Sequence, residues 1–392
     1  MKILFNYFLS IDLEISKLDL YSGEIWESTF SENIFTTILD YIDKGLKIRA
    51  IMIPSNGAFT QNDKAVEKIE YFIEEFSKRN VALHFSLSYD GILDLENRPY
   101  NNGELNNINY YDEEKLFNFA DRHNYGFHPM VSAYGIEKWV ENHKYWKEKM
   151  NKLNRKLAKA VMFLEVRDGD TWTDEAIVKY LEWLQVYSKD IIDEEFGENY
   201  YNALEHILRI HQDDNNFGYI PFFQHLDHSE TSCSLTQQLV IRLGDLAIVP
   251  CHRLCYDKFI YGQYIVENDS IVDVQGKNVN FMFSNLLLGG SGSLKCDTCP
   301  FNRYCIKQCR GACFEHHKET LFPIEDVCNL QIAKILFQLN LIMDISKKIP
   351  EEDYSPRMKL SIRNVKNFLD DIQKRKEYDK WISMVETYRI KF

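Results

Sequence analysis

The sequence predicts an α/β protein with a parallel sheet and outer helices, open or closed into a barrel, followed by a cysteine-rich region and a helical tail. Two observations lead to this expectation. Strand-like apolar runs alternate with helical segments over about the first 200 residues, and all nine cysteines lie from Cys233 onward. Strands that alternate with helices of crossover length favour a parallel sheet. A hydrophobic content of 45% is enough for a sizeable core.

Five strand-to-helix units are expected in order along the first part of the chain. The strands are predicted from short apolar runs, and the helices from apolar residues that recur every three or four positions. The expected strands are Lys17–Tyr21, Ile48–Ile53, Val81–Leu87, Tyr125–Val131 and Ala160–Val166. The expected helices are Ser31–Asp43, Lys64–Arg79, Glu113–Arg122, Ile136–Leu157 and Thr173–Ile192.

The alternation ends near Tyr200. Residues 218–294 read as short strands, loops and aromatic side chains, Asn329–Ile345 as an apolar core helix, and Arg357–Phe392 as a charged helical tail. We therefore expect three parts with boundaries at 1–200, 201–330 and 331–392.

Polar residues follow the predicted strands. Chemistry in parallel α/β sheets gathers at the carboxyl ends of the strands, which makes these residues candidates for a site. The alternative is that turns need such residues for local hydrogen bonds, that His128 is a core histidine, and that Glu165 and Arg167 form a structural ion pair. The candidates are Ser22-Gly23-Glu24, Ser55-Asn56-Gly57, Ser88 with Asp90, His128, and Glu165 with Arg167.

Charge and hydropathy exclude several classes. The chain has 46 Lys and Arg against 59 Asp and Glu, a net charge of −13, which disfavours nucleic acid and anionic lipid as partners. Asp12 and Glu14 interrupt the apolar start where a signal peptide would be uncharged, and no apolar run is long enough to span a membrane. We expect a cytoplasmic protein without a membrane or nucleic-acid partner.

The cysteines read as metal ligands. Nine thiols crowded into one stretch of an unsecreted chain favour thiolate ligands over disulfides. Four sulfurs complete either a zinc site or a [4Fe–4S] cluster, so nine suggest two centres. The alternative is one structural zinc with spare buried thiols. Upstream of the dense run, a hairpin is expected to bring Cys233 and Cys251 together.

The cysteine spacing resembles the SPASM domain of radical S-adenosylmethionine (radical SAM) peptide and protein maturases. The shared pattern is Cys233-x10-Gly244, Pro250-Cys251, then Cys-x2-Cys-x5-Cys-x3-Cys from Cys296 to Cys309, then Cys328. Ser22-Gly23-Glu24 looks like the Gly-Gly-Glu motif of that family, and Ser55-Asn56-Gly57 like its Ser-Asn-Gly turn. Segments 86–91 and 126–139 are also similar. The resemblance covers about residues 15–330.

This resemblance implies a partial (β/α) barrel of the TIM type that lacks its first unit, followed by an α+β SPASM domain with two auxiliary [4Fe–4S] clusters. One cluster would use Cys296, Cys299, Cys305 and Cys328. The other would use Cys233, Cys251 and Cys309, with Cys255, Cys313 or an open site completing it. Six residues separate Gly244 from Cys251 where the family usually has four, and His252 stands where some members place an acid. S-adenosylmethionine would contact Ser22, Gly23, Glu24, Asn56, Ser88 and Asp90.

The largest departure from the family is the absence of its Cys-x3-Cys-x2-Cys loop, since no cysteine precedes Cys233. We expect a chain that begins after the first barrel strand and that by itself does not cleave S-adenosylmethionine. Three hypotheses follow: a radical SAM/SPASM enzyme that modifies a ribosomal peptide with flavodoxin or ferredoxin as electron donor; a non-catalytic iron–sulfur relay or substrate-binding protein; and a zinc scaffold. Catalytic residues are not assigned.

Overall fold

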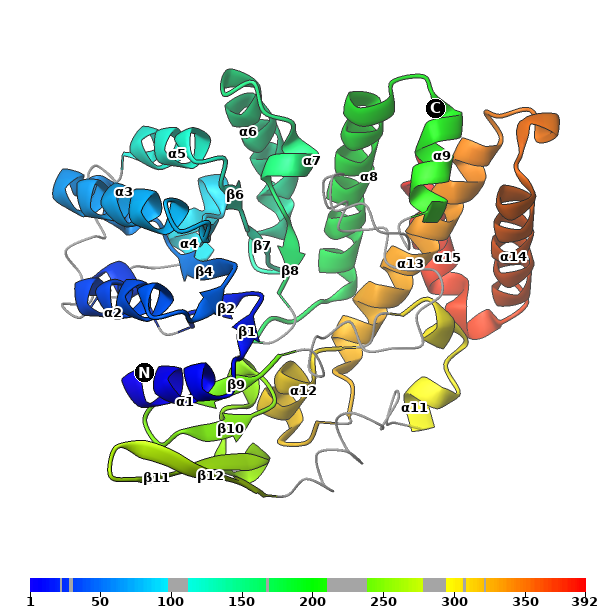
Figure 1. Ribbon diagram of the computed structural model, residues 1–392. Helices are drawn as coiled ribbons and strands as arrows, with labels where there is room; N and C mark the ends of the chain where they lie inside the picture. Colours follow the sequence, from blue (N-terminus) through cyan, green and yellow to red (C-terminus); the bar gives the residue numbers. More distant parts are fainter. Residues whose placement is uncertain are drawn as a thin grey trace. The chain divides into compact units, whose positions relative to one another are not determined.

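The computed structural model (Figure 1) describes residues 1–21, 23–27, 31–97, 112–166, 169–209, 238–277, 294–305, 308–320 and 322–392. It divides into two compact units. The first comprises the described residues of 1–90, 94–129 and 235–282, and the second those of 91–93, 130–234 and 283–392. Neither unit is continuous in sequence. The three-part division predicted above therefore stays a prediction.

The first unit contains a parallel four-stranded sheet in the order β2-β4-β5-β6. Its apolar strand residues are buried; Ile51 and Ile53 of β4 and Leu87 of β5 are fully inaccessible. In a separate parallel pair, β1 is hydrogen-bonded to β3. The strands are β1 Glu14–Ile15, β2 Leu18–Asp19, β3 Lys47–Ile48, β4 Ala50–Ser55, β5 Ala82–Leu87 and β6 Gly126–Phe127.

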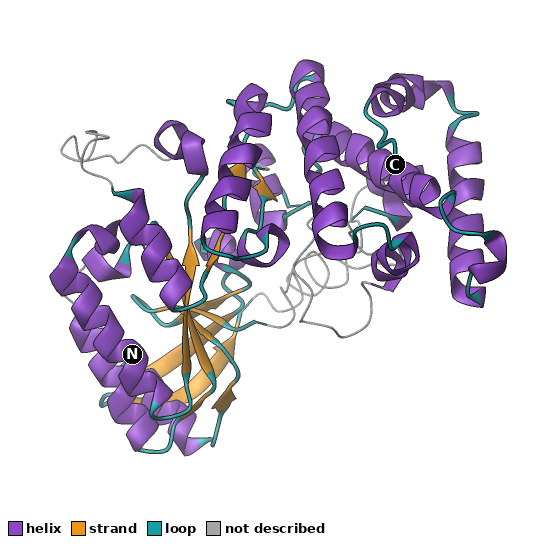
Figure 2. Cartoon of the chain, turned by 90° about the horizontal axis from the view of Figure 1, so that it is seen from above, coloured by secondary structure: helices purple, strands orange, loops and turns teal. Residues whose placement is uncertain are grey.

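Helices α2, α3 and α5 lie along one side of this sheet (Figures 1 and 2). Their apolar faces bury an aromatic cluster in which Trp26 stacks on Phe35 with 4.5 Å between ring centroids. Asn62 caps α3 by accepting hydrogen bonds from the amides of Lys64 and Ala65. The helices of the unit are α1 Lys2–Ser10, α2 Ser31–Asp43, α3 Asp63–Ser77, α4 Asp94–Asn97 and α5 Glu113–Arg122, with short 3-10 turns η1 Ile25–Glu27 and η2 Ala58–Gln61.

The same unit also contains an antiparallel sheet built from the later part of the chain, in the order β12-β11-β10-β9. Helix α1, which the sequence analysis did not predict, packs on β12, and its Tyr7 ring meets Tyr264 of β11. The strands are β9 Val240–Arg242, β10 Ala247–Val249, β11 Gly262–Glu267 and β12 Ser270–Gly276, with 3-10 turns η7 His252–Leu254 and η8 Asp257–Phe259.

The second unit is mainly helical. Its central helix α13 contacts α8, α9, α14 and α15, and its short parallel pair β7–β8 stands apart from the four-stranded sheet in hydrogen bonding. The elements are η3 Gly91–Leu93, β7 Met130–Val131, η5 Ile136–Lys138, α6 Trp139–Lys152, α7 Leu157–Ala160, β8 Leu164–Glu165, α8 Asp174–Phe196, α9 Tyr200–Arg209, α11 Leu294–Asp297, η10 Pro300–Arg303, α12 Arg310–His317, α13 Glu325–Ser346, η11 Glu351–Asp353, α14 Pro356–Ile372, η12 Lys376–Tyr378 and α15 Asp379–Thr387.

The predicted parallel α/β character is confirmed, but three boundaries were wrong. The strand predicted over Tyr125–Val131 is broken after Phe127, because Pro129 has no amide hydrogen for a ladder. The helix predicted over Ile136–Leu157 ends at Lys152, just before Asn154 takes a positive φ of 53°. Most of the strand predicted over Ala160–Val166 is missing, since α7 extends to Ala160 and β8 has two residues. Closure into a barrel stays a prediction.

The starts of two helices have the capping residues that their sequences favour. Thr173 caps α8 by accepting from the amide of Ala176, and Ser355 caps α14, which begins with Pro356. The predicted core helix and tail correspond to α13, α14 and α15. None of the helices in the described part of the chain has the length and apolar composition that crossing a membrane requires. A cytoplasmic location stays a prediction.

A buried ion pair joins β8 to α13. The carboxylate of Glu165 contacts the ammonium of Lys334 and accepts a hydrogen bond of 2.8 Å from the Tyr180 hydroxyl. Lys334 is fully inaccessible and Glu165 is 6% exposed. Charged side chains are stable at such depth when they are paired, so this contact fixes α13 against the short strand pair.

We expect Lys334→Met to lower the free energy of unfolding by about 3 kcal/mol, because it leaves a buried carboxylate without its cation. The double variant Lys334→Met/Glu165→Gln should recover part of the lost stability, because it no longer buries an unpaired carboxylate. Urea denaturation, monitored by near-ultraviolet circular dichroism, gives the free energy of unfolding of both variants. A Lys334→Met protein with an unchanged midpoint would contradict the assignment.

Candidate functional site

Glu24 lies at the carboxyl end of β4, as the sequence predicted for a polar cluster there. Its carboxylate accepts one hydrogen bond of 2.7 Å from the Ser55 hydroxyl and one of 2.8 Å from the Asn56 amide. Asn56 in turn accepts from the amide of Ala58, and Gly57 takes the left-handed conformation, φ 75°. These bonds hold the carboxylate of Glu24 in one orientation. A carboxylate fixed in this way at the end of a strand can accept charged hydrogen bonds from a ligand.

The next two strands end in further polar side chains. The Ser86 hydroxyl and Nδ1 of His128 are 3.0 Å apart, which gives His128 a hydrogen-bonding partner of the kind expected for a structural histidine. Ser88 is half-buried, and its amide donates to the Ser55 carbonyl across the sheet. Asp90 is fully buried, and its amide donates to the carboxylate of Asp94.

The remaining predicted residues differ in what the structure shows of them. Gly23 directly precedes Glu24 and has a positive φ of 50°, and among the described residues no atom beyond its chain neighbours lies within 4 Å of the place where its Cβ would be. Ser22 and Arg167 lie outside the described residues. Glu165 belongs to the second unit, where its carboxylate pairs with Lys334 of α13. The ion pair predicted between Glu165 and Arg167 stays a prediction.

Four cysteines of the second unit share one neighbourhood. Cys296 lies in α11, Cys299 caps η10, Cys305 follows η10, and Cys328 lies in the first turn of α13. The pKa of the Cys328 thiol is raised to about 12, mainly by burial; the nearby thiols of Cys305, Cys296 and Cys299 also raise it, and Lys295 opposes them. These are the four residues that the resemblance assigns to one cluster.

Two more cysteines belong to helix α12. Cys309 is its N-cap, and Cys313, four residues later, is 2% exposed. Burial raises the pKa of the Cys313 thiol to about 11, Cys309 and Cys296 raise it too, and Arg310 opposes them. Cys313 is thus set among the other thiols of the second unit.

The remaining cysteines are less informative. Cys251 is buried and Cys255 is exposed, both in the first unit, where the Cys255 thiol donates weakly to the Cys251 carbonyl at 3.7 Å. Cys233 and the hairpin predicted to position it against Cys251 lie outside the described residues. Among the residues that are described, no group of three or more His, Cys, Asp or Glu side chains is spaced to enclose a single metal ion.

Two contacts near these candidates were not predicted from the sequence. His252 stacks on Tyr21 with 4.5 Å between ring centroids and 7° between planes. Gln308, between two predicted ligands, contacts both Cys313 and Cys328. Neither contact could be predicted from residue spacing. Tyr21 and His252 are 231 positions apart, and a glutamine between cysteines is not part of a metal-binding motif.

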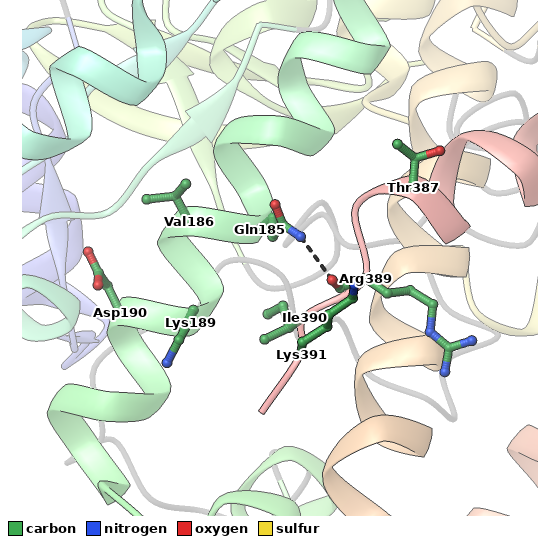
Figure 3. A pocket seen from close by; sticks show the side chains of 8 residues that line it. All are labelled: Gln185, Val186, Lys189, Asp190, Thr387, Arg389, Ile390 and Lys391. Carbon is green, nitrogen blue, oxygen red and sulfur yellow. Dashed lines mark hydrogen bonds between the residues drawn. The ribbon is translucent and has the colours of Figure 1, made fainter.

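A pocket of about 460 Å³ opens in the second unit between α8 and the segment that follows α15 (Figure 3). The amide of Gln185 donates a hydrogen bond of 2.9 Å to the Arg389 carbonyl across it. The lining residues include none of the predicted ligands; they are Gln185, Val186, Lys189, Asp190, Thr387, Arg389, Ile390 and Lys391. We assign the pocket no ligand.

Comparison with solved structures identifies the class of fold. The chain is similar to native anSMEcpe with bound AdoMet (16% identity, TM-score 0.56, 89% of each chain covered). It is also similar to native anSMEcpe with bound AdoMet and Cp18Cys peptide (16%, TM-score 0.55, 89% of this chain and 91% of the other). For the hexahistidine-tagged form of anSMEcpe with bound AdoMet the values are 15%, 0.54, 92% and 88%.

These neighbours are a radical SAM/SPASM anaerobic sulfatase-maturating enzyme, so the resemblance drawn from the cysteine spacing is confirmed at the level of the fold. No protein-family model matches the sequence, and no curated protein matches it either.

Asp190, at the edge of the pocket, gives a test of pH dependence. A 2.8 Å hydrogen bond with buried His143 lowers the pKa of Asp190 to about 2 from 3.8, and Lys147 adds to this while burial opposes it. A carboxyl whose pKa is lower in the folded state stabilises the fold above its unfolded pKa. That contribution is lost as pH falls from about 4 to 2.

We therefore expect Asp190→Asn to cost about 1 kcal/mol at neutral pH, after allowance for partial solvent screening. The gap from wild type should shrink as pH falls from about 4 to 2. Thermal unfolding from pH 7 to 2 measures it, with Asp193→Asn on the same helix as the exposed control. A gap that is as large at pH 2 as at pH 7 would contradict the proposed role of Asp190.

Proposed function

We propose that this chain is an iron–sulfur protein of the radical SAM/SPASM type that acts on a peptide. The observation that carries the proposal is the neighbourhood of Cys296, Cys299, Cys305 and Cys328 within a chain of this fold. Cysteine thiolates are the ligands of [4Fe–4S] clusters, and four complete one cluster. Such a cluster supplies one-electron transfer, or a site where substrate binds iron.

The role of the protein at this site would be to keep four cysteine sulfurs near one another, although this arrangement disfavours their deprotonation. The raised pKa of Cys328 means that the protein disfavours a bare thiolate there. A cationic iron core offsets that penalty by accepting the thiolate charge, and binding of the core therefore couples to deprotonation.

A second cluster is proposed on Cys233, Cys251 and Cys309. For its fourth ligand we favour Cys313 over Cys255, because Cys313 is buried four residues along α12 from Cys309, whereas Cys255 is exposed. Residues i and i+4 of a helix share a face, so both thiols can reach one centre.

AdoMet is proposed to bind at the carboxyl ends of the parallel strands. Glu24, held by Ser55 and Asn56, would accept hydrogen bonds from the ammonium group, beside Ser22 and Gly23. Ser88 and Asp90 follow the neighbouring strand and would face the rest of the ligand. Because the chain as printed has no Cys-x3-Cys-x2-Cys, we propose that by itself it does not cleave AdoMet reductively.

The peptide partner is proposed by analogy with the anSMEcpe complex that contains a peptide. Flavodoxin or ferredoxin is the proposed electron donor.

The missing Cys-x3-Cys-x2-Cys favours a second candidate, a non-catalytic electron relay or substrate-binding protein with the same clusters. A zinc scaffold is favoured less, because nine cysteines exceed the four sulfurs that one zinc site uses.

Iron and sulfide analysis tests the clusters. Anaerobically reconstituted protein should be brown and hold about eight irons and eight sulfides per chain, and Cys328→Ser should lose about half of them. Thr298→Ala, an exposed change between Cys296 and Cys299, is the matched control and should keep the wild-type content. Folded wild-type protein that binds one or two zinc ions and no iron would exclude both iron–sulfur candidates.

Binding and turnover of AdoMet test the strand-end site separately. With dithionite we expect no 5′-deoxyadenosine, although calorimetry should detect AdoMet binding. Glu24→Gln should weaken that binding roughly 10- to 100-fold, the value of one or two charge-assisted hydrogen bonds. Glu14→Gln, an exposed carboxylate paired with Arg49, serves as the control. Release of 5′-deoxyadenosine would contradict the proposal that this chain by itself does not cleave AdoMet. Equal affinity of Glu24→Gln and wild type would contradict the binding role of Glu24.

A further inference from the structure

Gln308 occupies an unusual position among the second unit's thiols. Its side-chain amide pairs in both directions with the backbone of Ile324: Nε2 donates to the Ile324 carbonyl and Oε1 accepts from the Ile324 amide, each at 2.8 Å. A backbone amide can only donate and a carbonyl can only accept, so this pairing fixes which end of the glutamine is oxygen and which is nitrogen.

The same side chain reaches two cysteines. Nε2, whose orientation is fixed as above, also donates to the sulfur of Cys328 at 3.1 Å. The Cys313 thiol donates weakly to Oε1 at 3.7 Å. Ile324 immediately precedes α13, and its carbonyl accepts from the Cys328 amide in the first turn. Gln308 therefore touches Cys328 directly and also holds the residue that begins the turn carrying it.

We propose that Gln308 is a positioning residue that donates an N–H···S hydrogen bond to the Cys328 ligand and raises the midpoint potential of the cluster it binds. This inference rests on the proposed function, since it takes Cys328 as a cluster ligand. An added electron increases the negative charge on the ligating sulfurs, and a donor aimed at one of them stabilises the reduced cluster. A neutral amide does so without changing the charge of the site.

Neutral Gln308→Met tests the proposal, because methionine matches the length of glutamine but has no N–H. We expect a lower midpoint potential by anaerobic potentiometry with EPR detection, and several-fold faster iron loss to a chelator. The potential that moves should belong to the signal that Cys328→Ser abolishes. Gln373→Met, at the exposed end of α14, is the matched control and should leave both potentials unchanged.

Gln308→Glu provides a second variant if Gln308→Met does not retain the cluster. It keeps an oxygen for the Ile324 amide, loses the donor to Cys328 and adds a negative charge. Both the lost donor and the added charge should lower its potential. An unchanged potential in a variant that retains the cluster would overturn the inference and leave the proposed function intact. Absence of iron from the wild-type protein would instead remove the proposed function and this inference together.

Discussion

Thiolates that lie close together repel one another, and burial adds to that cost. Cys328 meets both conditions, since it is largely withdrawn from water and three other thiols contribute to raising its pKa. A protein can retain such a group with the thiols protonated, or it can supply cationic iron to take up their charge. The proposed chemistry of the second unit depends on iron that takes up the thiolate charge, with Gln308 as a neutral hydrogen-bond donor beside Cys328.

The two units support this chemistry by different means. In the first, a parallel sheet places Glu24, Ser55 and Asn56 in one hydrogen-bonded group at the ends of its strands. In the second, α13 carries Cys328 near its start and Lys334 less than two turns later. The buried pair with Glu165 fixes this helix against β8, so the ligand is on a rigid element, as a precise metal site requires.

Much of this could be predicted where a pattern is local. Periodic apolar residues predicted α2, α3, α5 and α8, and a strongly apolar run predicted α13, each to within a few residues. The family resemblance proposed Cys296, Cys299, Cys305 and Cys328 as one ligand set, which stays a prediction. The errors arose where contacts between residues far apart in the sequence determine the local structure or the partner of a side chain. Nothing in the spacing of Ala160–Val166 shows that its first residue ends a helix, and the partner of Glu165 is 169 positions away in α13. Gln308 is informative only once its bonds to Ile324 are seen.

The most direct test of the account is Mössbauer spectroscopy of ⁵⁷Fe-labelled protein isolated without oxygen. We predict that nearly all the iron gives the quadrupole doublets of [4Fe–4S]²⁺ clusters, and that the doublet assigned to Cys296, Cys299, Cys305 and Cys328 disappears when those four residues are changed to serine. Folded protein whose spectrum contains no cluster iron would contradict it.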